Sequence, residues 1–310
     1  MSRARGISVV VALLLVSSTA CSSDSELTEP EDVGFVGADG VAVDATDTSR
    51  IVTLSGDLTE FVFALGHGDS VVATDVTTVE PEVAVLLPKA GIGRFLTPEG
   101  VLKHNPTLVI GDTQTAPATA IEQIRAAGVP VAIVDVPTTF KGLYSKVDQL
   151  GVLLGSAEAA QQLRDQMKTS IEAASVVPAD GDPLPRIAFV YTRGPDVMLL
   201  FGAEMTTTPV IEAAAGIDAG VDAGVVGTVD VTPEALAAAA PDVIIVPAEG
   251  YEVLGGIDGL LAIPGISATP AGATGAVLAY PEGDFLTFGP RIAASIQRLV
   301  SDLESVFETS

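Results

Sequence analysis

The chain has 310 residues, which is enough for one large domain or two of medium size. Hydrophobic residues make up 48% of it but aromatic residues only 5%, so the sequence predicts a sizeable core that is mainly aliphatic. Forty acidic residues against 15 basic ones give a formal net charge of −25, which argues against nucleic acid or an anionic lipid surface as a partner, because both require a basic surface.

The first 20 residues have the pattern of a signal peptide. Arg3 and Arg5 precede a mostly apolar run over residues 7–16, which is too short to stay in a membrane as a spanning helix. Small residues then lead to Cys21, the single cysteine of the chain, in an arrangement that resembles a bacterial lipobox, although Ser18 stands where leucine is usual. We expect Cys21 to be lipidated. The alternative is an ordinary secretory signal followed by an incidental cysteine.

Residues 21–49 have the composition of an acidic tether. Eight acidic residues and no basic residue lie in residues 22–49, and the larger apolar residues there are few. Such a segment repels itself and extends. We therefore expect disorder that holds a folded body away from a membrane, although residues 41–43 could already belong to that body.

From residue 50 onward, strand patterns and helix patterns alternate. An apolar stripe ending at Leu65 predicts a helix that Gly66 terminates. Short apolar runs before and after it are typical of buried strands: residues 51–54, 71–73, 108–111, 131–136, 186–191 and 243–246. This alternation predicts parallel sheets covered by helices.

The longest helical pattern covers residues 156–177. We expect Ser156 to cap this helix and Pro178 to end it. Because strand and helix patterns resume afterwards, we predict an α/β protein with two Rossmann-like lobes, residues 50–155 and 178–310. The single long helix joins them, and a ligand cleft lies between them.

A repeat supports two equivalent lobes. Thr97-Pro98-Glu99 and Thr232-Pro233-Glu234 lie 135 positions apart, and each precedes a second proline and an apolar run. Each copy predicts a helix that begins with threonine and proline, followed by a short turn and a buried strand. Two copies at a constant offset indicate that the lobes are structural counterparts.

Several motifs resemble those of class III periplasmic-type binding proteins, which are built on one rigid connecting helix. The resemblance covers roughly residues 50–305 and is greatest for the haem-binding branch. The motifs are Leu58-Thr59-Glu60, Ala64-Leu65-Gly66, Leu87-Pro88, Thr97-Pro98-Glu99-Gly100, Gly255-Gly256-Ile257-Asp258-Gly259-Leu260, Pro264-Gly265, Thr269-Pro270-Ala271-Gly272 and Phe288-Gly289-Pro290-Arg291.

This resemblance implies a non-enzymatic lipoprotein that captures haem outside the cytoplasm and delivers it to the permease dimer of an ABC importer. Haem is then the transported ligand and there is no enzymatic cofactor. We expect a monomer, anchored by lipid to the outer face of the cell membrane, that binds no nucleic acid. The same role for a ferric siderophore or cobalamin is the alternative ligand assignment.

Tyr191 ends a predicted strand, and Arg193 follows two residues later, so both side chains point to the same side of an extended chain. Tyrosine ligates ferric iron as a phenolate, and an adjacent guanidinium favours that form. The haem branch resembles this arrangement, which implies that Tyr191 is an axial ligand of haem iron. The alternative is a tyrosine that only closes the cleft. Tyr251 follows the strand at residues 243–246 and is a second candidate, or a loop tyrosine that packs on the protein.

The first lobe departs from the haem branch, whose members commonly carry a second tyrosine or histidine ligand before the Thr-Pro-Glu helix. Ile92 stands near that place and cannot coordinate, so we expect five-coordinate iron or another ligand. Arg94 is a candidate partner for haem propionates through bidentate hydrogen bonds. Thr78 is a candidate for ligand oxygens, although helix capping alone would explain it. Arg291 opens the last predicted helix, and we expect it to be structural.

The two histidines, His67 and His104, follow predicted helix ends away from the carboxyl ends of the strands, so a histidine-rich zinc or manganese site is not expected. No nucleophile–base pair or phosphate loop is recognisable, which argues against an enzyme on the same fold. By the resemblance, Glu99 and Glu234 meet arginines of the permease. The alternative is that they are only first-turn acids favoured by the helix dipole. A surface haem relay that never docks on a permease is a separate alternative function, and the glutamate pair argues against it.

Overall fold

The computed structural model describes residues 34–181 and 183–308. The predicted signal peptide, Cys21 and the tether up to residue 33 lie outside the described residues. Contacts divide the chain into residues 1–33 and one compact unit, Gly34–Ser310, which holds both sheets. Within the described part of the chain, no helix combines the length and the apolarity that crossing a membrane requires.

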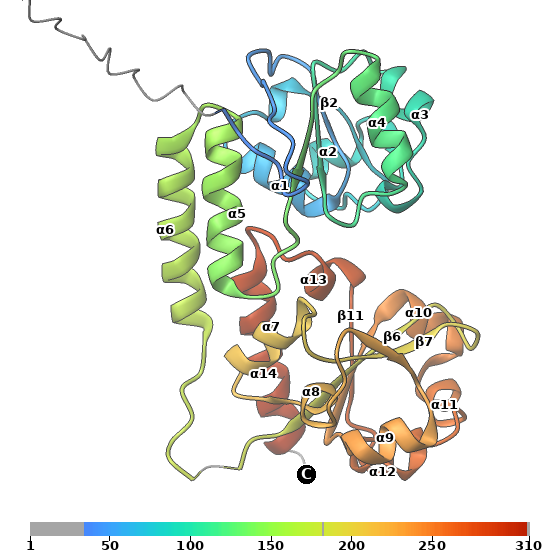
Figure 1. Cartoon of the computed structure of the whole chain (residues 1–310). Coiled ribbons are helices and arrows are strands. Elements are labelled where there is room, and N and C mark those ends of the chain that lie inside the picture. The colour runs from blue at the N-terminus through green and yellow to red at the C-terminus, as the bar shows by residue number, and fades with distance from the viewer. Residues whose placement is uncertain (1–33, 182, 309–310) are drawn as a thin grey trace, which may run out of the picture. The chain divides into compact units, whose positions relative to one another are not determined.

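A five-stranded parallel sheet forms the first lobe (Figure 1). Its strand order is β3-β2-β1-β4-β5, and β1, β4 and β5 are buried throughout, as expected for a parallel sheet covered on both faces. The four strands predicted in this lobe are confirmed with small shifts of their ends: β1 (Ile51–Thr53), β2 (Val71–Asp75), β4 (Leu108–Asp112) and β5 (Val131–Val134). Strand β3 (Lys89–Gly91) was not predicted.

Four short helices cover this sheet: α1 (Gly56–Ala64), α2 (Glu82–Val85), α3 (Pro98–Leu102) and α4 (Ala118–Ala126). Helix α1 buries the stripe that predicted it, including Leu58 and Phe61. Gly66 follows α1 with φ +86°, the left-handed conformation that ends helices and that glycine adopts without strain.

The second lobe contains a six-stranded mixed sheet of order β11-β10-β6-β7-β9, with β8 paired to β6. The expectation of a purely parallel sheet is wrong here, because β7 runs antiparallel to both β6 and β9. A turn closed by Arg193 N and Val197 O (3.1 Å) joins β6 to β7, and it is too short for the crossover that parallel strands need. The strands are β6 (Arg186–Thr192), β7 (Met198–Phe201), β8 (Ile217–Asp218), β9 (Thr228–Asp230), β10 (Val243–Pro247) and β11 (Val277–Tyr280).

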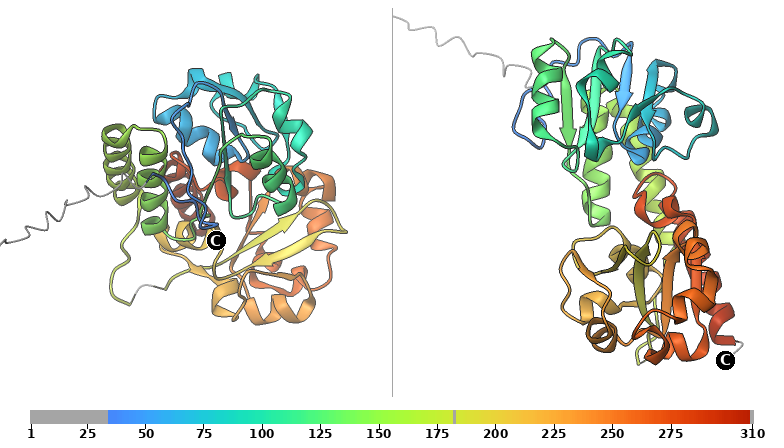
Figure 2. Two further views of the ribbon diagram at one scale, coloured as in Figure 1. Left: turned by 45° about the horizontal axis from the view of Figure 1, so that its top comes forward. Right: turned by 90° about the vertical axis from the view of Figure 1, so that its right-hand side faces the viewer.

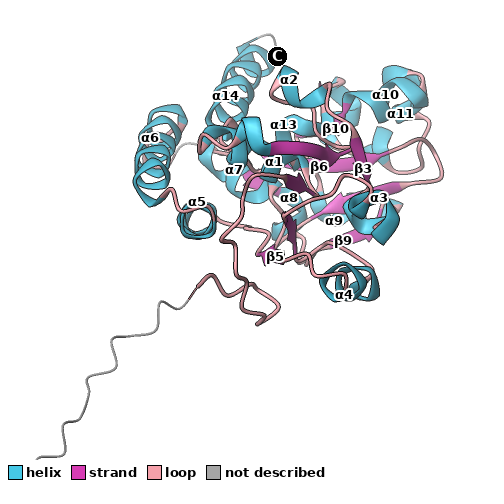
Figure 3. Cartoon of the chain, turned by 90° about the horizontal axis from the view of Figure 1, so that it is seen from above, coloured by secondary structure: helices cyan, strands magenta, loops and turns pink. Residues whose placement is uncertain are grey.

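The helices of the second lobe surround this sheet, as the view along a different axis in Figure 3 shows. They are α7 (Thr207–Ala213), α8 (Ala219–Asp222), α9 (Pro233–Ala239), α10 (Ala248–Leu254), α11 (Gly256–Leu261), α12 (Pro270–Thr274), α13 (Glu282–Leu286) and α14 (Ile292–Glu308).

The repeated Thr-Pro-Glu segments have the same local structure in both lobes. Each threonine is an N-cap: Thr97 Oγ1 accepts from Gly100 N at 3.3 Å, and Thr232 Oγ1 accepts from Ala235 N at 3.1 Å. Proline occupies the first turn of α3 and of α9, and each helix leads to a buried strand, β4 or β10. Each copy is therefore a capped helix followed by a buried strand, as the sequence predicts.

Two helices, α5 (Phe140–Leu153) and α6 (Ala157–Ala174), carry the chain from β5 to β6 and lie side by side (Figures 1 and 2). Helix α6 is the predicted helix of residues 156–177, but it ends three residues early, since Ser175 turns to extended backbone with ψ 143°. Ser156 does not cap it with its side chain. Helix α6 also packs against α14, which ties the C-terminus of the second lobe to the helical pair.

The described part of the predicted tether differs from the expectation. Phe35 and Val43 are buried, and Ala38 N donates to Ile133 O on β5 at 2.7 Å. Strand β5 is the edge of its sheet, so its outer carbonyls would otherwise lack partners. Residues 34–43 therefore pack on the first lobe, and the folded body begins before residue 50.

An ion pair between the buried Lys146 and the half-buried Asp57 joins α5 to α1. The amine of Lys146 donates to Asp57 and lies 5.9 Å from the centroid of the Phe61 ring. Burial alone would raise the pKa of Asp57, but the charge and hydrogen bond of Lys146 hold that pKa below its usual value. Removing Asp57 would cost about 3–5 kcal/mol, because the charge of Lys146 would stay buried without a partner. The pair therefore fixes the first lobe on the helix that follows it.

Candidate functional site

Tyr191 and Arg193 lie together at the carboxyl end of β6. The guanidinium Nε of Arg193 donates a hydrogen bond to the hydroxyl oxygen of Tyr191, and the guanidinium carbon lies 5.7 Å from the centroid of the tyrosine ring. That hydrogen bond raises the pKa of Arg193 above its usual value. A permanent positive charge therefore lies against the phenol oxygen, as the two-residue spacing predicts.

Glu282 completes this group and was not found by sequence reasoning. Both of its carboxylate oxygens accept from Arg193 Nη2, at 2.7 and 2.9 Å, and the Tyr191 hydroxyl donates to Oε1 at 3.4 Å. Glu282 begins α13 directly after β11, whose neighbour β10 pairs with β6. The strand order brings it to Tyr191 although 89 positions separate it from Arg193, and only knowledge of that order could have found it.

An aromatic cluster holds the ring of Tyr191. The ring stacks on Phe201 of β7 with centroids 5.9 Å apart, and Phe201 in turn contacts Phe189 at 5.0 Å. Side chains alternate between the faces of a strand, so Phe189 and Tyr191 share one face of β6. The phenol is thus fixed on a buried base while its oxygen reaches the polar group formed with Arg193 and Glu282.

Tyr251 lies on the other face of the same sheet. It sits in α10 and packs on the cluster that contains Ala188 and Val190, the residues of β6 that alternate with those on the Tyr191 face. Helix α10 runs so close to the sheet that a Cβ on Gly250 would lie 1.9 Å from Thr192 O. The structure therefore does not bring Tyr251 together with Tyr191.

In the first lobe, Asp75 joins the two loops that contain the predicted site residues. Its buried carboxylate accepts from Thr77 N at 2.7 Å and from Gly93 N at 2.6 Å. The loop after β2 and the loop after β3 are thereby held side by side. Ile92 lies in the second of these loops with an exposed side chain.

Arg94 and Thr78 have different surroundings in these loops. Arg94 is exposed and donates to Gln114 Oε1 at 2.5 Å, and among the described carboxylates none forms an ion pair with it. Thr78 is buried, with its hydroxyl 3.0 Å from that of Thr59. Arg94 is accessible to a carboxylate ligand, whereas the Thr78 hydroxyl is directed into the lobe.

The first-lobe loop after β2 meets α13 of the second lobe. Gly283, the residue after Glu282, lies against this loop. If Gly283 carried a Cβ atom, that atom would lie 3.1 Å from Cγ2 of Val79. Arg291 and Glu60 also join the lobes, through hydrogen bonds of 2.8 and 2.9 Å. Burial raises the pKa of Glu60 although Arg291 opposes the shift. The guanidinium of Arg291 is thus engaged in an ion pair, as a structural role requires.

The other predicted residues lie elsewhere. Glu99 and Glu234 are exposed in the first turns of α3 and α9. His104 follows α3 with Nε2 buried and without a partner among the described atoms, and burial lowers its pKa. His67 follows α1 and lies just before a short 3₁₀ turn. The described residues contain no cluster of three or more histidine, cysteine or acidic side chains placed to hold a metal ion.

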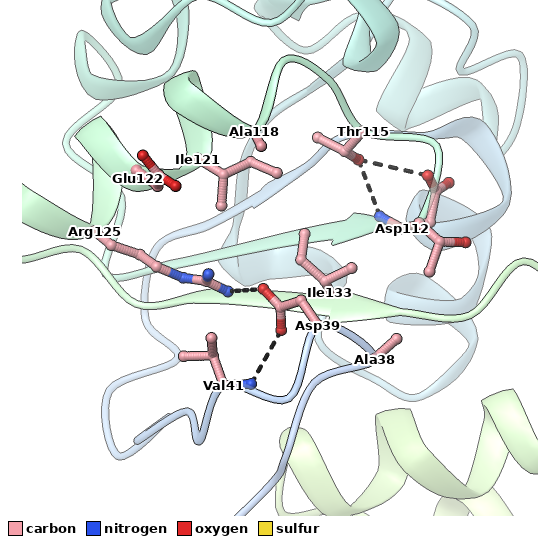
Figure 4. A pocket seen from close by; sticks show the side chains of 11 residues that line it. Ala38, Asp39, Val41, Asp112, Thr115, Ala118, Ile121, Glu122, Arg125 and Ile133 are labelled. Carbon is pink, nitrogen blue, oxygen red and sulfur yellow. Dashed lines mark hydrogen bonds and ion pairs between the residues drawn. The ribbon is translucent and has the colours of Figure 1, made fainter.

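A cavity of about 410 Å³, drawn in Figure 4, is not lined by Tyr191, Arg193 or Glu282. It is lined by Ala38, Asp39 and Val41 and by parts of β4, the loop after β4, α4 and β5. The ion pair of Arg125 with Asp39 (2.7 Å) lies at one end of it. Asp112 and Thr115 lie at its other end. None of the predicted ligand residues lines this cavity.

Comparison with known sequences gives the family. The model of the periplasmic binding protein family matches residues 51–283. The chain is 28% identical over 265 residues to an uncharacterized ABC transporter substrate-binding lipoprotein, YvrC of Bacillus subtilis, covering 79% of this chain and 81% of that protein. It is 25% identical over 268 residues to a cobalamin-binding protein of Halobacterium salinarum, covering 83% and 69%.

Solved structures agree with this assignment. The periplasmic heme-binding protein RhuT from Roseiflexus sp. RS-1, in its apo form, superposes with a TM-score of 0.79 at 38% identity, over 84% of this chain and 99% of that one. The periplasmic heme-binding protein BhuT in complex with two hemes superposes with a TM-score of 0.75 at 33% identity, over 83% and 98%. The chain therefore belongs to the periplasmic binding protein family, as a solute-binding protein of an ABC importer and not an enzyme.

Proposed function

We propose that this chain captures haem outside the cytoplasm and delivers it to an ABC permease, with the haem iron held by the phenolate of Tyr191. The observation that carries this proposal is the Tyr191–Arg193 contact at the end of β6. Tyrosine ligates ferric iron as a phenolate, and the Arg193 guanidinium supplies a positive charge beside that oxygen. The aromatic base under the ring keeps that oxygen in one place.

Two further features support haem as the ligand. Arg94 is exposed and lacks an ion pair among the described residues, so its planar guanidinium can bind a propionate with two hydrogen bonds. The haem-binding neighbours RhuT and BhuT are 38% and 33% identical to this chain, whereas the cobalamin-binding relative is 25% identical. Cobalamin remains the second candidate because of that relative.

The test is direct binding to three ligands. Purified protein is titrated with haem, cyanocobalamin and a ferric hydroxamate siderophore, and absorbance and equilibrium dialysis report binding. We expect haem to bind at micromolar concentration or below, with absorbance bands typical of tyrosinate-ligated ferric haem. Cobalamin and the siderophore should bind at least about 100-fold more weakly, a difference of about 2.7 kcal/mol. Tighter binding of cobalamin would replace haem as the assigned ligand.

The proposal also includes a lipid anchor at Cys21, supported by the lipobox-like pattern before it. Cells that express the full chain should incorporate labelled fatty acid into it and retain it with the membrane fraction. The Cys21→Ser chain should lose the label and appear in the soluble extracytoplasmic fraction. Equal labelling of both chains would contradict the anchor, and the haem proposal would be unaffected.

A further inference from the structure

We propose that the first lobe contributes an apolar wall and no iron ligand, and that one face of the porphyrin packs on this wall while Tyr191 binds the iron from the other face. The wall consists of Val79, Ile92 and Phe95. This inference rests on the proposed function and adds which side chains of the first lobe meet the ligand and in what manner.

The wall residues are unusually exposed for their size. The exposed fractions are 77% for Phe95, 52% for Val79 and 42% for Ile92. All three fall within 17 consecutive residues, Val79 in the loop after β2 and Ile92 and Phe95 in the loop after β3. Isolated exposed apolar residues are ordinary, but a concentration of them in two adjoining loops marks a surface that an apolar partner covers.

A chain of contacts connects the wall to the Tyr191 group. Glu282 binds Arg193 and Tyr191, and its neighbour Gly283 approaches Val79 within van der Waals range. Val76 N, in the same loop as Val79, donates to Gly91 O at 3.0 Å, directly before Ile92. The wall on the first lobe is thus adjacent to the Tyr191 group of the second lobe. A ligand bound to Tyr191 can therefore contact the wall.

The wall cannot supply a nitrogen or sulfur ligand for iron. Residues 76–95 contain no histidine, tyrosine, cysteine or methionine. The one amine of that stretch, Lys89 Nζ, donates to Thr74 Oγ1 at 2.9 Å. The wall offers an apolar surface, and the exposed Arg94 lies between Ile92 and Phe95 in the sequence. A ligand with a flat apolar face and an anion at its edge would match both. Haem has both properties.

The test introduces a side chain into the wall that can coordinate iron. Ile92→His should convert haem bound to the protein from five-coordinate, high-spin iron to six-coordinate, low-spin iron, seen by absorbance and electron paramagnetic resonance. Val176→His is the control: its exposed fraction, 39%, is close to that of Ile92, but it follows α6 and bonds to the end of α7 through its backbone. The control should leave the wild-type spectrum unchanged.

A second variant tests the packing. Phe95→Ser should weaken haem binding about tenfold, whereas Phe307→Ser, an exposed phenylalanine near the end of α14, should not change it. Neither residue is buried, so folding is preserved. If Ile92→His leaves the iron high-spin and Phe95→Ser binds haem normally, the wall is not the contact surface, while haem binding through Tyr191 stands. A wild type that binds no haem overturns the proposed function and this inference together.

Discussion

Tyr191→Phe should lower haem affinity by at least about 100-fold and abolish the tyrosinate bands of the haem spectrum. Loss of a group that only supports a metal ligand typically costs about 10–100-fold in affinity, so loss of the ligand itself should cost no less. The phenylalanine ring keeps the stacking contact with Phe201, and the deleted oxygen contacts only Arg193 and Glu282 among the described side chains. The substitution therefore separates ligation from packing. Haem titration monitored by absorbance, with thermal unfolding as the check on folding, measures both.

Two further tyrosine-to-phenylalanine variants serve as controls for Tyr191→Phe. Tyr144→Phe removes a phenol oxygen from α5 and should leave the spectrum and the affinity unchanged. Tyr251→Phe should also leave the haem spectrum and the haem affinity unchanged, because Tyr251 packs on the opposite face of the sheet from Tyr191. If Tyr191→Phe binds haem normally and Tyr251→Phe does not, the iron ligand is Tyr251, and the Arg193 contact has another role.

Glu99→Ala combined with Glu234→Ala should abolish uptake of haem while haem affinity of the isolated protein stays within a few-fold of wild type. Both acids are exposed in the first turn of helices with identical threonine caps, one in each lobe. A permease with two subunits can therefore meet one acid from each lobe. Charge pairs at the rim of an interface mainly set orientation and association rate. Uptake by cells or by permease-containing vesicles, compared with haem binding in solution, measures the effect.

The control for docking is Glu158→Ala combined with Glu304→Ala, which removes the same charge. Glu158 is also an exposed first-turn acid, in α6. The control therefore also loses a favourable interaction between a carboxylate and the helix dipole, which is worth about 0.3–1 kcal/mol. It should support normal uptake. Normal uptake by the Glu99 and Glu234 double variant would contradict docking, and loss of haem binding in that variant would place both acids at the ligand instead.

The sequence by itself determined the features that depend on near neighbours. Threonine caps, prolines in first turns and the glycine after α1 act within about four residues, so the two Thr-Pro-Glu helices and the end of α1 are where they were expected. The pairing of Tyr191 with Arg193 is also local, since alternate residues of a strand share a side. These features made the fold class and the centre of the candidate site predictable.

Only the tertiary structure decided the contacts that depend on strand order. Glu282 joins Arg193 because β11, β10 and β6 are neighbours in the sheet, and Phe35 is buried because the edge of β5 is open beside it. The burial of Lys146 against Asp57 likewise depends on the packing of α5 on α1, which are far apart in the chain. Such contacts form when distant segments bury apolar surface and satisfy each other's polar groups, which no short-range pattern in the chain encodes.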